Sequence, residues 1–255
     1  MRLAISIIIH HKLDFFELQL RNIRNYYPVA LILVHVNYAH GELHASDIER
    51  LSQVYNFIIN PVSFPVQWVS AVHFSALVSN LRLLYTIPDW DSWIYLSGNE
   101  LFLKGGLEQL YSEEPCVWDY HHGKVTNYIR DEIGTRYDYG LQKFGYNEHT
   151  FITGWGNGRF FNRKAAGELL EVLNEFWPGY EYPAEISGHS LYAMDDIVFP
   201  TIMKHLESLG KIKIILDVRI STWISHIGVE EGHIVKHVIM DINDPYVKQI
   251  TSSYN

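Results

Sequence analysis

The stretch Trp93-Ile94-Tyr95-Leu96-Ser97-Gly98-Asn99-Glu100-Leu101-Phe102-Leu103 decides the fold of this chain of 255 residues. Its first apolar run is short and stops at Ser97-Gly98, which is typical of a buried strand and not of a helix. A carboxamide and a carboxylate, Asn99 and Glu100, follow directly. Ligands of open α/β sheets collect where strands end at the carboxyl edge. The stretch therefore predicts a central strand and one wall of a binding site.

The residues before this stretch predict a repeating pattern of strands and helices. Leu3–Ile9 is almost entirely apolar and β-branched, as expected of a strand covered on both faces. Asp14 can cap a helix with one apolar face, Pro28 ends that helix, and Val29–Val36 predicts the second strand. Such a β-α-β unit implies a right-handed crossover and a parallel pair. Further helices are expected at 45–51 and from Trp68, and a third strand at 55–59.

After Leu103 the pattern is looser and predicts short elements with long connections. Residues 119–150 are rich in Tyr, His and Gly without a clear period, which is typical of a binding loop. Amphipathic helices are expected at 164–176 and from Asp195, and short strands at 116–118, 159–161 and 213–218, with residues 219–223 following the last strand. We therefore predict one α/β domain over residues 1–255, with a mostly parallel central sheet and helices on both faces.

Composition and charge restrict the classes of function. The formal net charge is -9, which argues against nucleic acid as a partner because phosphate contacts need clustered Lys and Arg. Cys116 is the single cysteine, so the sequence predicts neither a disulfide framework nor a cysteine-based zinc site. No run approaches the ~18 apolar residues of a membrane span, and Met1–His10 is better explained as a strand than as a signal peptide. We expect a cytoplasmic protein.

Four stretches, in this order, resemble the core-2/I-branching β-1,6-N-acetylglucosaminyltransferase family, glycosyltransferase family 14. They are Ser6–Lys12 with the leucine-rich helix behind it, Val34–Asn37, the segment from Trp68 through Trp90–Glu100, and Asp195–Ile202. The resemblance implies a GT-A-like fold and an inverting, metal-independent transfer from a nucleotide sugar. It makes UDP-N-acetylglucosamine the leading donor and implies no cofactor. Residues 1–103 would form the nucleotide-binding half, and residues 104–255 the acceptor side with the catalytic base.

Asp196 is the candidate general base, because the resemblance aligns it with the catalytic Glu of the family. In inverting transfer the acceptor hydroxyl must lose its proton as it attacks. The alternative is that Asp195 and Asp196 only occupy the first turn of a helix, where carboxylates are favoured. The chain departs from the family pattern at three positions. Asn37 replaces an Asp, Glu100 stands where Asp is usual, and Asp196 is one methylene shorter than Glu.

The other candidate site residues come from the resemblance and from the strand ends. The donor-binding candidates are His10, His11, Asn37, Trp68, Ser97, Gly98, Asn99 and Glu100. The diphosphate-binding candidates are Lys248 and Arg219, with Lys236, Arg159 and Arg163 as further cations that could offset charge on the leaving group. The acceptor-binding candidates are Trp155 and Trp223, whose amphipathic rings suit a carbohydrate surface, together with Asp195. Asp89-Trp90-Asp91 precedes its strand, so we interpret it as a turn and expect no metal site.

Two other functions remain open at this point. One is a catalytically inactive module of the same fold that binds a carbohydrate or a nucleotide sugar. The other is a glycoside hydrolase with Glu100 and Asp196 as its carboxylate pair, which would then lie ~5–10 Å apart. The sequence favours a glycosyltransferase with a nucleotide-sugar donor and a glycan or glycolipid acceptor. It predicts no membrane span and is compatible with peripheral membrane association.

Overall fold

The computed structural model describes residues 1–10, 12–38, 43–65, 71–118, 145, 159–176, 194–217, 219–223, 232–236, 238 and 240–252, with only the backbone at 71, 118, 176, 194–197, 221–223 and 236. The elements follow in the order β1 (Leu3–Ile9), α1 (Leu13–Tyr26), β2 (Leu31–Val36), α2 (Ala45–Tyr55), β3 (Ile58–Ile59), α3 (Ala71–Tyr85), β4 (Ser92–Leu96), β5 (Leu101–Phe102), α4 (Leu107–Leu110), β6 (Cys116–Trp118), β7 (Phe160–Asn162), α6 (Arg163–Phe176), α7 (Met194–Ser208), β8 (Ile214–Leu216), β9 (Ser221–Trp223), β10 (Ile234–Lys236) and α8 (Pro245–Thr251).

The central sheet has the strand order β3-β2-β1-β4-β7-β6-β8. Its first four strands are parallel, and the register places Ile7 of β1 between Val34 of β2 and Leu96 of β4. β7 is antiparallel to both of its neighbours, so β6 and β8 run in the same direction as β4. The prediction of a mostly parallel α/β sheet is therefore confirmed.

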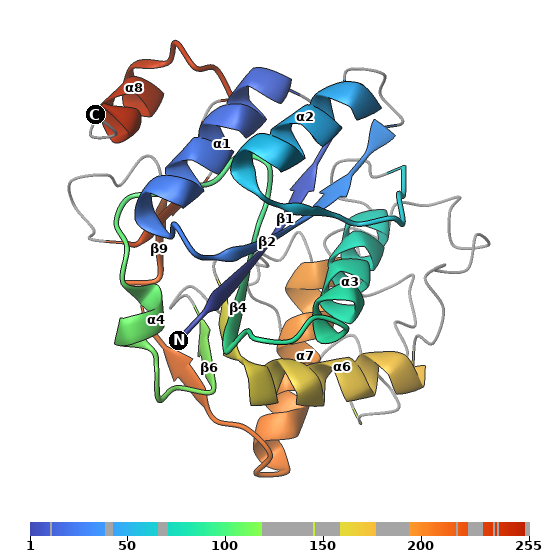
Figure 1. The fold of residues 1–255 in the computed structure, drawn as a ribbon. Coiled ribbons are helices and arrows are strands. Elements are labelled where there is room, and N and C mark those ends of the chain that lie inside the picture. Colours follow the sequence, from blue (N-terminus) through green and yellow to red (C-terminus); the bar gives the residue numbers. More distant parts are fainter. Residues whose placement is uncertain are drawn as a thin grey trace, which may run out of the picture.

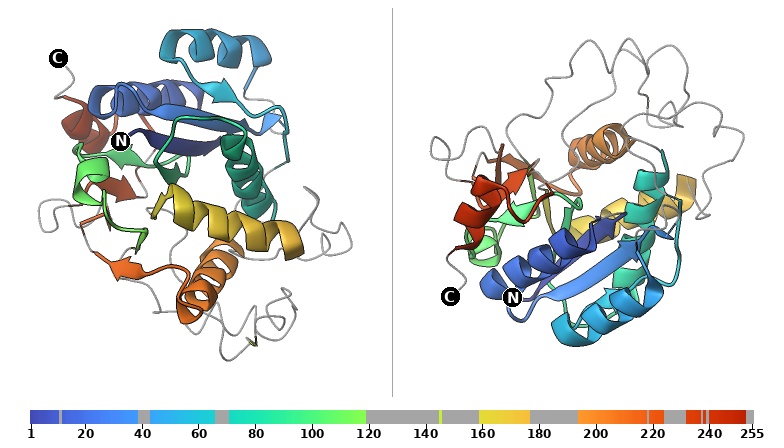
Figure 2. Two further views of the ribbon diagram at one scale, coloured as in Figure 1. Left: turned by 60° about the horizontal axis from the view of Figure 1, so that its bottom comes forward. Right: turned by 90° about the horizontal axis from the view of Figure 1, so that it is seen from above.

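Helices cover both faces of this sheet, as the alternating side chains of β1 require. Ile5 and Ile7 join the core on the side of α1 and α2, whereas Ala4 and Ile8 join the core on the side of α3, α6 and α7. Figure 1 and the two views of Figure 2 show the two helical layers. Every residue of β1 is buried, and each buried Ile contributes about 1.5–3 kcal/mol to stability. This is why an almost continuous apolar run forms the centre of the fold.

A second, small sheet lies beside the first and follows directly from the central stretch. Its order is β5-β10-β9, with β10 antiparallel to β5 and parallel to β9. Helix α8 covers it, because Val247 and Ile250 pack in one cluster with Phe15, Leu101 and Val235. The sequence predicted neither β10 nor α8.

The start of α1 differs from the prediction. Asp14 is not the N-cap: the helix begins at Leu13, and the cap residue is Lys12, whose φ of 60° is left-handed and which makes no side-chain cap bond. Asp14 instead accepts a hydrogen bond from its neighbour's backbone, Phe15 N to Oδ1, at 2.8 Å. The left-handed backbone of Lys12 therefore starts the helix two residues before the position that an Asp14 cap would give.

Candidate functional site

Three neighbouring strand ends bring the predicted donor-binding residues to one edge of the sheet. β1, β2 and β4 are parallel and adjacent, and the residues that follow them are His10, Asn37 and Ser97. Asn37 is 1% exposed, and its backbone N–H donates to the carbonyl oxygen of Ile9 at 2.8 Å. The structure therefore places these residues together at the carboxyl edge, where ligands of open α/β sheets collect.

The turn Ser97–Glu100 at the end of β4 is held by its own side chains. Oε2 of Glu100 accepts a hydrogen bond from Ser97 N at 2.8 Å, and the Ser97 hydroxyl donates to Oδ1 of Asn99 at 2.6 Å. A Cβ at Gly98 would lie 3.3 Å from the carbonyl oxygen of Ile8, so the turn packs closely on β1. Glu100 is 1% exposed, whereas Asn99 is partly exposed. The carboxylate thus faces into the turn and the carboxamide lies at its surface.

Two side chains of α1, which the sequence analysis did not identify, form hydrogen bonds with the backbone of this turn and of the strand after it. Nε2 of Gln19 donates to the carbonyl oxygens of Ser97 and Glu100, at 2.9 and 2.8 Å. Asn22 exchanges two hydrogen bonds with the backbone of Phe102, at 2.8 and 2.7 Å. We call Gln19 and Asn22 the α1 amide pair. In the sequence, the only sign of this role is that both amides occupy positions in the apolar face of the helix. In the structure both side chains are 0% exposed.

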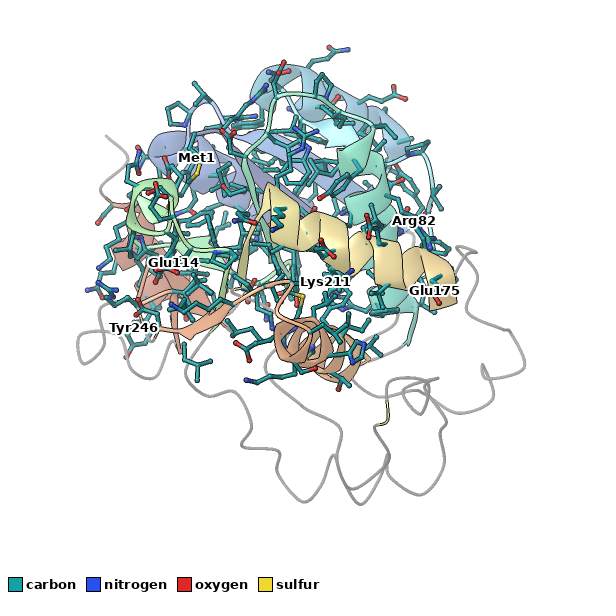
Figure 3. All side chains as sticks on the ribbon, turned by 90° about the horizontal axis from the view of Figure 1, so that it is seen from below. Met1, Arg82, Glu114, Glu175, Lys211 and Tyr246 are labelled. Carbon is teal, nitrogen blue, oxygen red and sulfur yellow. The ribbon has the colours of Figure 1, made fainter. Side chains whose placement is uncertain are left out.

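The first turn of α7, which carries Asp195 and Asp196, begins at the same edge of the sheet. α7 leads through a short connection into β8, which runs in the direction of β4, so α7 runs the opposite way. Phe199, one turn after Asp195, contacts Tyr95 of β4 with ring centroids 6.0 Å apart. Figure 3 shows the molecule from below and labels Met1, which precedes β1, and Lys211, which follows α7. The backbone position fits a site role for both carboxylates, and the role of Asp196 stays a prediction.

Arg219 lies at the far end of the small sheet from the turn. Its guanidinium Nε donates to both oxygens of Asp217, each at 2.9 Å, and this pairing raises the pKa of Arg219 and lowers that of Asp217. β9 and β10 run parallel, and beyond β10 the N–H of Val238 donates to the Asn99 carbonyl oxygen at 3.0 Å. The ends of these strands, with Trp223 and Lys236, are therefore nearer to the turn than Arg219 is.

Lys248 is exposed on α8, beside the residues that attach this helix to the small sheet. Its neighbour Val247 packs in one cluster with Leu101, which follows Glu100, and with Phe15 in the first turn of α1. This packing keeps the helix close to the turn at the end of β4. The position is compatible with the predicted diphosphate contact, which stays a prediction.

The two remaining arginine candidates have different environments. Arg159 is 1% exposed, and its Nη1 donates to the Tyr95 hydroxyl at 3.5 Å, so it is a buried cation near the end of β4 and not a surface charge. Arg163 lies at the opposite edge, where its N–H donates to the Asp91 carbonyl oxygen and its guanidinium stacks 4.9 Å from the Trp90 ring. Arg163 therefore lies away from the strand ends that form the site.

Polar side chains are also buried on the face of the sheet that α3 covers, next to β1 and β2. Nδ2 of Asn60 donates to Ser79 Oγ and to Asn80 Oδ1, both at 2.9 Å. Nε2 of His35 accepts from Phe64 N at 3.0 Å, and the two rings stack at 5.6 Å. Burial, followed by the charge of nearby His73, lowers the pKa of His35 to about 4. We call His35, Asn60, Ser79 and Asn80 the α3-face cluster.

Some predicted residues are not placed by the structure. His11, Trp68 and Trp155 lie outside the described residues, and the side chains of Asp195, Asp196, Trp223 and Lys236 are also outside the description. Within the described ranges, no group of three or more His, Cys, Asp or Glu side chains is arranged to hold a metal ion. Within the same ranges, no helix has the length and apolar character needed to cross a membrane.

Comparisons with known proteins identify the fold. No family model matches the sequence, and no curated protein does. Among solved structures, an active-site mutant of LgtC has 11% sequence identity and a TM-score of 0.50, over 98% of this chain and 94% of the other. The galactosyltransferase LgtC in complex with donor and acceptor sugar analogs has 11% identity and a TM-score of 0.49, over 98% and 95%. The chain has a GT-A-like α/β fold.

Proposed function

We propose that this protein is a glycosyltransferase that moves a sugar from a nucleotide-sugar donor to a hydroxyl of a glycan or glycolipid. By the sequence resemblance, the donor is UDP-N-acetylglucosamine, the transfer inverts the anomeric centre, and no metal takes part. Cytoplasmic location belongs to the same proposal. The fold likeness to LgtC, which is described as a galactosyltransferase with donor and acceptor sugars, supports the class of reaction.

One observation carries the proposal. Polar residues at the ends of three adjacent parallel strands meet at one edge, and the turn of α7 with the two aspartates begins at this edge. The strand ends offer His10, Asn37 and the turn Ser97–Glu100 for the donor. A carboxylate from a different element, on the other side of the donor, is what an in-line displacement requires.

In the proposed reaction the acceptor hydroxyl attacks the anomeric carbon while the bond from that carbon to the diphosphate oxygen breaks. Asp196 takes the hydroxyl proton, and the nucleoside diphosphate leaves with the bonding electron pair. Cationic side chains stabilise the charge that develops on the leaving group. We assign this task to Lys248, whose neighbour Val247 packs with Leu101, and to Lys236 at the end of β10, whereas Arg219 is paired with Asp217.

The decisive experiment is a transfer assay after a thermal-shift screen of nucleotide sugars. The wild-type protein is expected to bind UDP-N-acetylglucosamine and to release UDP in the presence of EDTA. Asp196→Asn should lower kcat by roughly 10²–10⁴, since it removes the proton acceptor, while the donor Kd stays within about twofold. Asp195→Asn makes the same chemical change one residue earlier and should act mainly on the acceptor KM. Wild-type turnover by Asp196→Asn would remove the assignment.

The same measurements separate the other candidate functions. Tight donor binding without turnover would indicate an inactive binding module. Hydrolysis of a glycoside without a nucleotide would indicate the hydrolase. The placement of Glu100 weighs against the hydrolase, because its carboxylate is buried and accepts from Ser97 N.

A further inference from the structure

We propose that Gln19 is a positioning residue for substrate binding: it fixes the turn Ser97–Glu100 so that the Asn99 carboxamide donates to an oxygen of the nucleotide sugar. The inference rests on the proposed function, because it needs a nucleotide sugar at this edge of the sheet. It changes the expected role of Glu100 from a sugar contact to a support of the turn. It also adds Gln19, which no motif indicates, to the residues that determine donor affinity.

The first step is the fixed backbone of the turn. Gln19 donates to the carbonyl oxygens of Ser97 and Glu100, and the Ser97 N–H donates to the Glu100 carboxylate. The carbonyl oxygen of Asn99 accepts from the Val238 N–H at 3.0 Å. The turn is thus bonded from α1, from the small sheet and from within. A loop fixed in this way does not have to be ordered when a ligand binds.

The second step is the orientation of the Asn99 side chain. Its Oδ1 accepts from the Ser97 hydroxyl at 2.6 Å, so the Nδ2 group lies on the other side of the carboxamide. A side-chain amide carries two N–H donors on that nitrogen. Among the described residues, none accepts from Nδ2 of Asn99. The complementary ligand atoms are oxygens with lone pairs, such as sugar hydroxyls and diphosphate oxygens.

Asn22 provides a matched control for Gln19. It is one turn further along the same helix, is equally buried, and makes the same kind of amide-to-backbone bond, but to Phe102 beyond the turn. The substitutions Gln19→Met and Asn22→Leu replace each amide by an apolar side chain of similar shape. Both should lower the melting temperature. Only Gln19→Met should move the turn.

The experiment measures the Kd of UDP-N-acetylglucosamine by calorimetry and the hydrogen exchange of two backbone amides. Gln19→Met should raise the Kd about tenfold and speed exchange at Ser97, since small misplacements of positioning groups cost large factors. Asn22→Leu should speed exchange at Phe102 and leave the Kd within about twofold. Equal effects of the two variants on the Kd would overturn the inference. A wild-type protein that binds no nucleotide sugar would overturn the proposed function itself.

Three substitutions within the turn test the same inference if the variants of α1 do not fold. Ser97→Ala removes the hydroxyl that orients Asn99 and should raise the Kd about threefold, because one hydrogen bond that fixes a rotamer is lost. Glu100→Gln keeps an oxygen acceptor for Ser97 N and should retain more affinity than Glu100→Leu, which has none. Unchanged affinity in Ser97→Ala, or equal losses in both Glu100 variants, would contradict the assignment.

Discussion

Two groups of buried polar side chains lie on opposite faces of the central sheet, and both rely on side-chain amides. On one face the α1 amide pair, Gln19 and Asn22, bonds the backbone between Ser97 and Phe102. On the other face Asn60 donates to Ser79 and Asn80 of α3. Buried amides are costly unless they are bonded, so each group fixes the elements that it joins.

The two groups differ in what they hold and in whether they titrate. The α1 amide pair bonds a turn of the candidate site and contains no group that changes charge. The α3-face cluster joins β1, Asn60 directly after β3, and α3, since Asn80 also donates to the Ile7 carbonyl oxygen at 3.3 Å. It also includes His35, whose pKa is lowered. Substitutions in the α1 amide pair are therefore expected to change the geometry of the turn as well as stability, whereas those in the α3-face cluster should change stability and its dependence on pH.

The largest expected effect is acid destabilisation through the α3-face cluster. Burial and His73 lower the pKa of His35 from 6.5 to about 4, so the unfolded chain binds the proton more tightly. The contribution of this group to the free energy of unfolding is complete above about pH 6.5 and falls by about 3 kcal/mol as the pH drops toward 4. Denaturant unfolding at a series of pH values measures the loss.

His35→Gln is the control for this prediction. A glutamine can still accept from Phe64 N, as Nε2 of His35 does at 3.0 Å, but it does not titrate between pH 4 and 7. The difference in unfolding free energy between the wild-type protein and the variant should therefore shrink as the pH falls. A difference that is constant over this range would show that His35 is not the group responsible.

A smaller effect is expected for Ser79→Ala, which tests whether the α3-face cluster affects stability without affecting nucleotide-sugar affinity. Ser79 Oγ accepts one of the two hydrogen bonds from Asn60, and Asn80 still accepts the other. The substitution should lower the free energy of unfolding by about 1 kcal/mol, the usual net value of such a bond. Chemical denaturation measures it, and Ser208→Ala, on an exposed helix end, is the control. A loss of nucleotide-sugar affinity in Ser79→Ala would contradict this expectation.

Much of the fold could be predicted because burial repeats along the chain. Leu3–Ile9 is apolar almost throughout because both faces of its strand are buried, and the apolar stripe of α1 recurs every third or fourth residue because one face of this helix is buried. β10 has three residues, and its place is decided by pairing with Phe102, more than a hundred residues earlier. No local pattern encodes such a pair, so the sequence did not predict it.

The candidate site divides in the same way. His10, Asn37 and Asn99 could be predicted as neighbours, because parallel strands must end at one edge. The roles of Glu100 and Gln19 could not. The sequence does not distinguish a carboxylate that faces into the protein, such as Glu100, from one that faces solvent. It also does not distinguish a buried amide that bonds the backbone, such as Gln19, from an amide on the surface. Orientation is decided by the packing of α1 on the turn, which only the structure shows.

The smallest expected effect concerns a contact outside both groups, the pair Asp217–Arg219. Arg219 is exposed and already bonded to Asp217, and exposed pairs contribute little to stability. Arg219→Gln should leave the unfolding midpoint nearly unchanged and the UDP-N-acetylglucosamine Kd within about threefold, whereas Lys236→Gln should raise the Kd about tenfold by removing a charged contact to the diphosphate. Calorimetry on the two variants measures the contrast. β9 and β10 both run toward Asn99. Loss of Lys236, at the end of these strands, should therefore raise the Kd more than loss of Arg219, which lies at their start. The reverse order would return Arg219 to the diphosphate site and would require its pair with Asp217 to open when the donor binds.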